Sequence, residues 1–449
     1  MKTIVALSTP SGSGAIGIIR ISGDDCLLIA STHFPKMKSF SPRKAILCKF
    51  YESSGHVLDE VLLVYFPGPN SYTGEDVVEI SFHGSSYILQ SALKELIQSG
   101  AILAKAGEFT QRAFLNGKLD LVQAEAVGDL IASESRSAHD LAMRQMKGSV
   151  SVRLQELRQQ LIDFAALIEL ELDFSEEDVE FAQRPALYKL FNDLKAEIEK
   201  MLDTFTLGNA IKNGIPLILA GAPNAGKSTL LNRFLGEDRA IVTKFAGTTR
   251  DSIEEKFRLG DHLFRIVDTA GLRISNDEVE ILGIERSWKL MSEGQIILFL
   301  IDPTSCSSGE AKKLEEEIVN RSPNASILKI LTKSDLWDKI NYLEYFPDAL
   351  YTGINVDLKN IQTKLSSFID DNKWDGSSDI LIANIRHAEA LNSSLTSLKK
   401  AEEGLNNRVS GEFIAFELKE ALDSLGSITG EVIADDLLSS VFGRFCIGK

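Results

Sequence analysis

Cysteine is scarce in this chain. Its 449 residues include only Cys26, Cys48, Cys306 and Cys446, and no two of them form a C-x-x-C pair. Such wide spacing argues against a disulfide framework and against a structural zinc site. The sequence therefore favours a protein of a reducing compartment.

Long apolar runs and an excess of positive charge are also missing. The apolar run 295–302 is far shorter than the ~20 residues of a membrane-spanning helix, so it indicates a buried central strand. The apolar residues 4–7 are followed too soon by Pro10 and Gly12 for a secretory signal. We therefore expect a cytoplasmic protein with no membrane partner. A net charge of −16 disfavours a broad nucleic-acid groove, so any RNA contact must be local or shared with a partner.

The most informative pattern that is present is G-x-x-x-x-G-K-S at residues 221–228. An apolar strand candidate, 217–220, precedes it, and residues 229–235 have the pattern of a helix start. A strand, a glycine-rich turn and a helix N-terminus together aim backbone N–H groups at phosphate oxygens. We therefore predict a nucleoside triphosphate site in which Lys227 binds the β- and γ-phosphates and the Ser228 hydroxyl ligates Mg²⁺.

Three further motifs follow in order. The sequence GTTRD at 247–251 offers a threonine to Mg²⁺ and the γ-phosphate, as a switch loop does. The strand candidate 264–267 ends in Asp268, which can hold the Mg²⁺ shell, and Gly271 follows it. The strand candidate 327–331 leads into TKSD at 332–335, where the Asp335 carboxylate can accept from guanine N1–H and the 2-amino group. Because adenine lacks that pair of donors, we expect GTP rather than ATP.

Two residues depart from the usual GTPase pattern. Thr332 replaces the asparagine of N-K-x-D, so a hydrogen bond to the base or to the phosphate loop is lost, and we expect weaker binding with guanine preference retained. Leu272 stands where many GTPases carry the glutamine that orients the attacking water. Glu280 can act through a bridging water, although a solvated helix start explains it equally well. The final motif, usually S-A-K, is hard to place near residues 352–354.

The sequence contains three kinds of segment, which differ in their pattern of apolar and turn-forming residues. Residues 1–118 mix short β-rich runs such as 15–21 and 60–66 with turn clusters, which indicates an α+β domain. Residues 119–210 and 377–449 have apolar residues at helical spacing, and each segment alone makes a thin amphipathic stack. We therefore expect a multidomain α/β protein in which both helical segments form one discontinuous all-α domain. A P-loop GTPase domain with a mostly parallel sheet, residues 211–376, is inserted between them.

Several longer motifs carry a resemblance to a known family. They are Thr9-Pro10 followed by GIIRISG at 17–23, FPGPNSYTGED at 66–76, GEFTQRAFLNGK at 107–118, and FCIGK at 445–449. Together they resemble the MnmE (TrmE) family of GTPases that modify the wobble uridine of tRNA. The resemblance runs from residue 3 to the last residue.

The resemblance implies a folate-binding N-terminal domain that dimerises, and a Ras-like GTPase domain. It also implies an FAD-dependent partner of the MnmG type, with which a heterotetramer installs an aminomethyl or carboxymethylaminomethyl group on C5 of uridine 34 in tRNA. The one-carbon unit would come from a tetrahydrofolate derivative, 5,10-methylene or 5-formyl. By motif alignment the folate contacts fall on Arg20, Glu79, Lys118 and Lys449. Basic residues suit the anionic glutamyl tail of folate.

The family pattern also implies how GTP is hydrolysed here. Mg²⁺ is assigned to Ser228 and Thr249, and K⁺ to Asn224, Thr243, Phe245 and Thr248. K⁺ would supply the charge of an arginine finger and pair two GTPase domains, and Glu280 matches the water-orienting glutamate. The residues assigned to GTP are Asn224, Ala225, Gly226, Lys227, Ser228, Thr229, Thr243, Lys244, Phe245, Ala246, Gly247, Thr248, Thr249, Asp268, Thr269, Ala270, Gly271, Thr332, Lys333 and Asp335.

Cys446 has two interpretations. In the family pattern C-[ILV]-G-K, a thiol near the chain end can take part in the modification chemistry, and Arg444 and Lys449 would lower its pKa. Alternatively, Phe442 and Phe445 indicate that the tail docks on an apolar surface, where Cys446 would only help to position it.

The leading hypothesis is therefore a GTPase whose hydrolysis drives the conformational changes of a tRNA-modifying enzyme. The alternative is a GTP-switched ribosome or ribonucleoprotein assembly factor, which would need neither the folate-type motifs nor the Cys446 tail. The sequence does not identify the tRNAs that are modified, the nitrogen donor (glycine or ammonium), or the extent of GTPase-domain movement.

Overall fold

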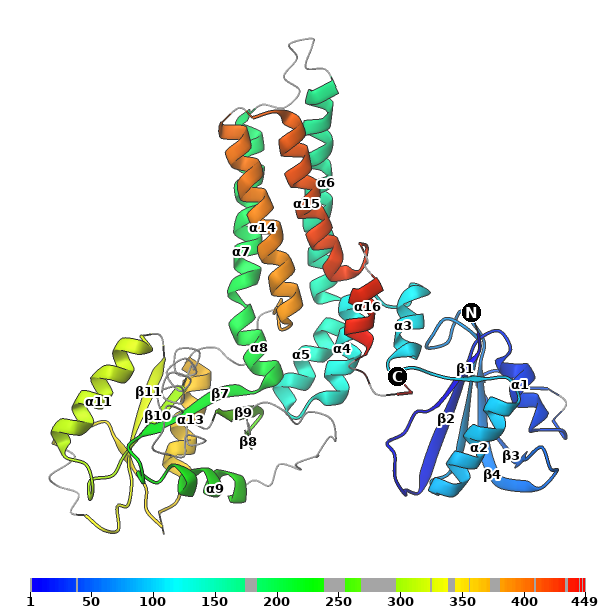
Figure 1. Ribbon diagram of the computed structural model, residues 1–449, viewed down its shortest axis with the longest axis horizontal. Helices are drawn as coiled ribbons and strands as arrows, with labels where there is room; N and C mark the ends of the chain where they lie inside the picture. Colours follow the sequence, from blue (N-terminus) through cyan, green and yellow to red (C-terminus); the bar gives the residue numbers. More distant parts are fainter. Residues whose placement is uncertain are drawn as a thin grey trace, which may run out of the picture. The chain divides into compact units, whose positions relative to one another are not determined.

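The computed structural model divides the chain into two compact units. It describes residues 2–37, 39–173, 184–237, 255–267, 296–323, 325–337, 344–354, 356–371, 380–407, 409–432, 435–443, 445 and 447–448. The first unit consists of Met1–Ile131, Arg144–Ala196 and Glu389–Lys449. The second consists of Ala132–Met143 and Glu197–Ala388. Figure 1 shows the elements of both.

A six-stranded sheet forms the N-terminal part of the first unit, in the order β3-β4-β5-β2-β1-β6. Its strands are β1 (Ile4–Leu7), β2 (Ile16–Ser22), β3 (Ile46–Tyr51), β4 (Val57–Phe66), β5 (Val77–His83) and β6 (Ile102–Leu103). All neighbouring pairs are antiparallel except β1 and β6. Helices α1 (Cys26–Thr32) and α2 (Ser86–Gln98) contribute to one buried core with the sheet. The expected α+β domain is confirmed.

Alternation along β5 separates the core from the other face of this sheet. Val78, Ile80 and Phe82 are buried in the core, whereas Glu79 lies between them in the sequence and is only partly buried. Successive side chains of a strand point to opposite faces, so Glu79 and its register partner Arg20 share the face away from this core.

Four long helices form the all-α part of the chain, and they come from two separate segments (Figure 1). They are α6 (Ser149–Asp173), α7 (Arg184–Asp203), α14 (Ile385–Asn406) and α15 (Gly411–Thr429). The Phe164 and Phe191 rings meet edge to face at 4.7 Å between α6 and α7. Lys195 on α7 donates to Glu402 on α14 at 2.5 Å. The Lys195–Glu402 contact joins the segments before and after the GTPase motifs, which confirms the expected discontinuous helical domain.

Four shorter helices are described before and after these long ones in the sequence. They are α3 (Glu108–Leu115), α4 (Leu121–Ala132), α5 (Arg136–Met146) and α16 (Asp435–Phe442). Helices α3, α4 and α16 share a small core in which Leu121, Ala124 and Phe442 are buried, with Phe445 packed against it. The last described residues thus contact segments more than 300 positions earlier in the chain.

The second unit contains a six-stranded sheet in the order β12-β11-β10-β7-β9-β8. The strands are β7 (Ile215–Gly221), β8 (Glu255–Leu259), β9 (His262–Val267), β10 (Ile296–Ile301), β11 (Ser326–Leu331) and β12 (Leu350–Tyr351). All pairs are parallel except β8 with β9. Every residue of β10 is buried, as expected for a central strand. The mostly parallel sheet of a P-loop GTPase is therefore confirmed.

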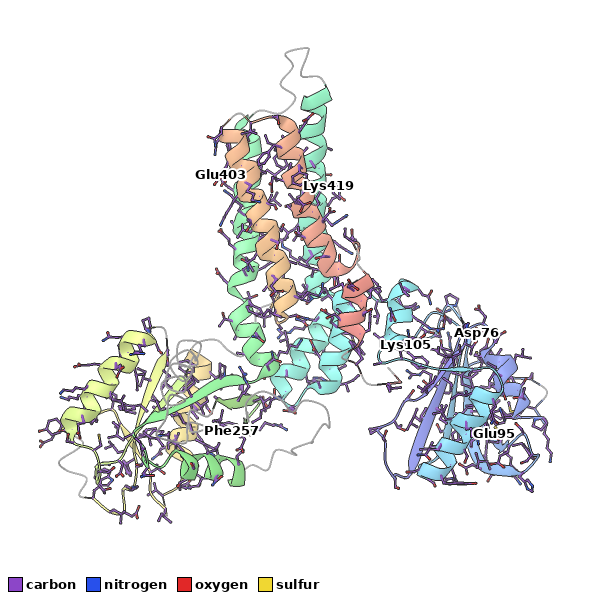
Figure 2. All side chains as sticks on the ribbon, viewed as in Figure 1. Asp76, Glu95, Lys105, Phe257, Glu403 and Lys419 are labelled. Atoms are coloured by element: carbon purple, nitrogen blue, oxygen red, sulfur yellow. The ribbon has the colours of Figure 1, made fainter. Side chains whose placement is uncertain are left out.

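Helices cover both faces of this sheet. Residues of α8 (Phe205–Asn213), α9 (Lys227–Glu237) and α13 (Lys359–Asp371) enter the core on one face, and residues of α11 (Ser308–Arg321) enter the core on the other. Phe257, labelled in Figure 2, stacks between Phe234 at 4.7 Å and Phe264 at 5.2 Å on the first of these faces. The expected start of the GTPase domain at residue 211 falls inside α8. None of the described helices is long and apolar enough to cross a membrane.

Candidate nucleotide-binding site

The phosphate loop lies between β7 and α9, at the carboxyl end of a central parallel strand. Gly221 has φ 146° and Gly226 has φ 94°, and a Cβ on Gly221 would collide with the Leu300 carbonyl oxygen. Glycine is needed at both positions because L side chains rarely adopt such angles. Asn224, with φ 62°, is also in the left-handed region and is exposed. The motif therefore forms the strand, tight turn and helix that its sequence predicts.

Lys227 folds back over the loop that precedes it. Its Nζ donates to the carbonyl oxygens of Gly221 at 2.8 Å and Ala222 at 2.9 Å. Ser228 and Thr229, in the first turn of α9, are exposed, so their hydroxyls and the helix N-terminus are accessible to an anion and its metal ion. The three residues together offer the positive charge and the hydroxyl ligand that a Mg²⁺-triphosphate requires.

A pocket of about 310 Å³ adjoins this loop. It is lined by Gly226, Thr229, Leu230, Arg233, Thr332, Lys333, Asp335, Leu336, Thr352, Gly353 and Ile354. The structure therefore brings the phosphate motif and the TKSD motif, more than 100 residues apart in sequence, to one cavity. Parallel strands explain this, because β7, β10, β11 and β12 all end at the same edge of the sheet.

The TKSD segment is held from behind by β10. The Thr332 hydroxyl donates to the Ile301 carbonyl at 3.2 Å, and Lys333, with φ 54°, donates to the Asp302 carboxylate at 2.6 Å. Burial alone would raise the pKa of Asp302, but hydrogen bonds from Lys333, Thr304 and Ser305 outweigh that effect and hold its pKa at about 2. The segment is thus anchored by a carboxylate that stays ionised at neutral pH.

Six lining residues were not assigned to the nucleotide from the sequence: Leu230, Arg233, Leu336, Thr352, Gly353 and Ile354. Thr352, Gly353 and Ile354 directly follow β12, and Arg233 lies on α9. A Cβ on Gly353 would lie 2.6 Å from Asp335 Oδ1, so this loop lies next to the carboxylate that is expected to bind guanine. The position of the loop in the fold identifies it, because it follows β12, the strand next to β11. Its sequence, Thr-Gly-Ile, does not match the usual S-A-K motif.

Many of the residues expected in the site lie outside the described residues. They are Thr243, Lys244, Phe245, Ala246, Gly247, Thr248, Thr249, Asp268, Thr269, Ala270, Gly271 and Glu280, together with Cys446 and Lys449. Strand β9 is described up to Val267, the residue before Asp268, and it pairs with β7 in parallel.

A second set of expected residues lies in the N-terminal domain. Arg20 and Glu79 are register partners on β2 and β5, and the Arg20 guanidinium lies 2.7 Å from the Glu79 carboxylate. The Arg20 guanidinium also lies over the rings of Tyr72, at 5.3 Å, and Phe109, at 5.6 Å. Lys118 approaches Gly74, in the same loop as Tyr72. Three of the four expected folate residues are therefore described, and two of them form one ion pair.

The segment after α16 contacts the N-terminal domain. Ile447 pairs with Ala106, Ser8 Oγ donates to the Gly448 carbonyl oxygen at 3.2 Å, and Phe445 packs beside Gly128. The contact before Cys446 is apolar, through Phe445, whereas the contacts after it are a backbone bridge and a hydrogen bond, with the Ile447 side chain exposed. Cys446 itself is not among the described residues.

Comparison with known proteins gives full-length relatives. Residues 3–118 match the family described as "GTP-binding protein TrmE N-terminus", and residues 121–446 match the "MnmE helical domain". The chain is 42% identical over 462 residues to the tRNA modification GTPase MnmE of Flavobacterium johnsoniae, covering 100% of this chain and 99% of the relative. It is 44% identical over 466 residues to the protein of the same name from Parabacteroides distasonis, covering 100% of each.

Two solved structures match this chain with low overall similarity. The G domain of T. maritima FeoB is 21% identical, with a TM-score of 0.26, covering 34% of this chain and 98% of that one. Aquifex aeolicus Era bound to GDP·AlF4⁻ is 20% identical, with a TM-score of 0.28, covering 40% of this chain and 66% of that one. At these scores the likeness adds nothing to the fold described above.

Proposed function

This chain belongs to the MnmE family of tRNA modification GTPases, and from that premise we propose that it is the GTP-hydrolysing subunit of the complex that modifies C5 of uridine 34 in tRNA. The modification adds an aminomethyl or carboxymethylaminomethyl group. Hydrolysis of GTP drives the conformational change that the modification reaction requires. The observation that carries the proposal is the single cavity that joins the phosphate loop to Asp335.

GTP binds with its phosphates at the residues from Asn224 to Thr229 and its guanine at Thr332, Lys333 and Asp335. The Lys227 ammonium, which donates to two carbonyls of its own loop, exchanges those weak partners for phosphate oxygens. The Asp335 carboxylate accepts from guanine N1–H and the 2-amino group. The remaining contacts come from residues 243–249 and 268–271.

Mg²⁺ and K⁺ are the metal ions of this site. The exposed Ser228 hydroxyl at the start of α9 fits a Mg²⁺ ligand, with Thr249 as a second one. Asn224, exposed on the phosphate loop, fits a K⁺ ligand, together with Thr243, Phe245 and Thr248. When bound, K⁺ would supply positive charge to the transition state, and Glu280 would orient the attacking water in place of the glutamine that Leu272 replaces.

The N-terminal domain binds a tetrahydrofolate derivative, 5,10-methylene or 5-formyl, through Arg20, Glu79, Lys118 and Lys449. The Arg20–Glu79 pair supports this, because the Arg20 guanidinium lies over the rings of Tyr72 and Phe109 and both charged groups can exchange partners with a polar, planar ligand. Cys446 either takes part in the chemistry or positions the tail. The docked residues around it favour positioning.

The chain acts in the cytoplasm as a homodimer that joins an FAD-dependent MnmG-type subunit in a heterotetramer. Its four-part division is residues 1–118 for folate binding and dimerisation, 119–210 and 377–449 for the helical domain, and 211–376 for the GTPase domain. The tail 445–449 completes the second helical segment.

Mass analysis of wobble uridines tests the proposal. Cells that lack the protein are complemented with the wild-type chain, with Lys227→Ala, or with Lys313→Ala as a control on the exposed surface of α11. We expect the C5 modification to return with the wild type and Lys313→Ala and to stay absent with Lys227→Ala. Unchanged uridines in the deletion strain would refute the proposed function, and would favour a GTP-switched assembly factor.

A further inference from the structure

Arg233 ties the helix of the phosphate loop to the loop that follows β12. Its Nη1 donates to the Gly353 carbonyl at 2.9 Å and to Thr352 Oγ1 at 3.2 Å, and its Nη2 donates to the Val356 carbonyl at 2.5 Å. Arg233 lies on α9, six residues after Lys227, and lines the pocket. One guanidinium can bind several carbonyls at once because its five N–H donors form a rigid planar fork.

The loop after β12 lines the base side of the pocket with Thr352, Gly353 and Ile354. Its backbone is joined to the TKSD segment by Ser334 N donating to the Thr352 carbonyl at 3.1 Å, and to β11 by Thr352 N donating to Leu331 at 2.8 Å. The Ile354 N–H donates to Asp335 Oδ1 at 3.4 Å, a long hydrogen bond that a bound guanine would replace with its own donors and acceptor. An N–H beside that carboxylate suits guanine, whose O6 acceptor is next to the N1–H donor on the same edge.

Among the described residues, Thr332 does not link the phosphate loop to the base side of the pocket by hydrogen bonds. In the described part of the chain its hydroxyl donates only to the Ile301 carbonyl. Its Cβ and Cγ2 are each 3.7 Å from the place where a Cβ on Gly226 would stand, so Thr332 faces Gly226 across a space that a methyl group would fill. The asparagine found in N-K-x-D would place an amide with two donors and an acceptor at this junction.

We propose that Arg233 replaces the missing asparagine as the link between the phosphate side and the base side of the pocket. It is a positioning residue for guanine: it holds Thr352, Gly353 and Val356 so that the Ile354 N–H meets O6 while Asp335 takes N1–H and the 2-amino group. This inference rests on the proposed guanine nucleotide site, and it adds a specificity determinant that lies outside the four GTPase motifs.

The first test measures GDP, IDP and ADP dissociation constants of the full-length chain by competition with a fluorescent GDP. Arg233→Met keeps the apolar stem and removes the donors. We expect affinity for GDP and for IDP, which keeps O6, to fall about tenfold, as for the loss of a charge-assisted hydrogen bond. Affinity for ADP, which lacks O6, should stay the same. Equal losses for GDP and ADP would mean that Arg233 only supports the phosphate loop, and would overturn the proposal.

Arg233→Lys and Arg321→Met serve as matched variants. Arg233→Lys keeps the charge but lacks the planar fork, so its GDP affinity should lie between that of the wild type and that of Arg233→Met. Arg321, on α11, pairs with Glu317 on the exposed surface and does not line the pocket, so Arg321→Met should bind GDP like the wild type. Thermal unfolding of each variant accompanies the binding data. If Arg233→Met unfolds, the lysine variant carries the same comparison of GDP with ADP.

The second test is a double-mutant cycle with Thr332→Asn, which restores the usual motif. We expect Arg233→Met to cost about tenfold in GDP affinity beside Thr332 and no more than about threefold beside the restored asparagine. The same loss in both backgrounds would show that Arg233 does not stand in for asparagine. If the wild-type chain binds no guanine nucleotide at all, the proposed function fails instead, so the two failures are distinguishable.

Discussion

Lys333 donates to Asp302 at 2.6 Å, across the carboxyl ends of two neighbouring parallel strands. Ile301 and Leu331 are register partners, so the residues that follow them emerge side by side. The base-binding segment is thus anchored by the strand next to it, and the Asp302 side chain is fully buried. The pairing leaves Asp335, two residues after Lys333, at the pocket.

The Asp302–Lys333 pair makes stability depend on pH. The Asp302 pKa is about 2 against an ordinary value of 3.8, so the ionised carboxylate with its hydrogen bonds from Lys333, Thr304 and Ser305 contributes about 2 kcal/mol to the free energy of unfolding above pH 4. That contribution is lost as the pH falls from 4 through 2. We expect Asp302→Asn to be less stable by about 2 kcal/mol at pH 7 and by about half as much at pH 3.

Urea unfolding followed by Trp337 fluorescence measures this gap, since Trp337 Nε1 donates to the Thr332 carbonyl at 2.7 Å. The other two tryptophans, Trp288 and Trp374, are replaced by phenylalanine in both proteins. A gap that is equal at pH 7 and pH 3 would contradict the depressed pKa.

Gly353→Ala should weaken guanine nucleotide binding. The added Cβ would lie 2.6 Å from Asp335 Oδ1 and 2.8 Å from Ser334 Oγ, so the carboxylate that binds the base has to move. Crowding of this kind costs roughly 1–3 kcal/mol, so we expect GDP affinity to fall about tenfold. Gly309→Ala is the control, because a Cβ there meets nothing within 4 Å. Calorimetric titration that finds equal affinities for both variants would be inconsistent with this crowding.

Removal of the Arg20 guanidinium should abolish most folate binding without touching the nucleotide site. Arg20→Met leaves Glu79 without its 2.7 Å partner and removes the charge beside Tyr72. We expect affinity for 5-formyltetrahydrofolate to fall at least about tenfold, the effect of losing a charge-assisted hydrogen bond, while GDP affinity is unchanged. Arg153→Met, on α6, removes an arginine that pairs with Glu156 on the helical domain and should change neither. Unaltered folate affinity in Arg20→Met would remove Arg20 from the site.

The rate of GTP hydrolysis should depend on K⁺ through Asn224. We expect the wild-type chain to turn over GTP faster in KCl than in NaCl by about tenfold or more, because K⁺ stabilises the transition state. Asn224→Gly tolerates the φ of 62° but removes the ligand, so it should hydrolyse GTP at the same slow rate in both salts. Phosphate release at matched ionic strength is the measurement. Equal wild-type rates in KCl and NaCl would exclude the K⁺ site.

The site was predictable from sequence where function demands particular residue types at short spacing. Gly221, Gly226 and Lys227 are such residues, because a phosphate loop needs glycine at positive φ and a cation at the start of a helix. Thr352, Gly353 and Ile354 were not placed, because the loop uses backbone groups that any residue type supplies. Arg233 has no distinguishing pattern at all, since an arginine on a helix is usually a solvated surface residue.

By itself, the sequence determined the order of the domains, the P-loop GTPase fold, the preference for guanine and membership in a tRNA-modifying family. Short-range patterns carry these features, since hydrophobic period and glycine placement act over a few residues. Only the tertiary structure decided which distant side chains meet: Arg20 with Glu79, Lys333 with Asp302, and Arg233 with the loop after β12. The register of the strands and the edge at which parallel strands end determine these contacts. Neither can be inferred from a short segment of the sequence.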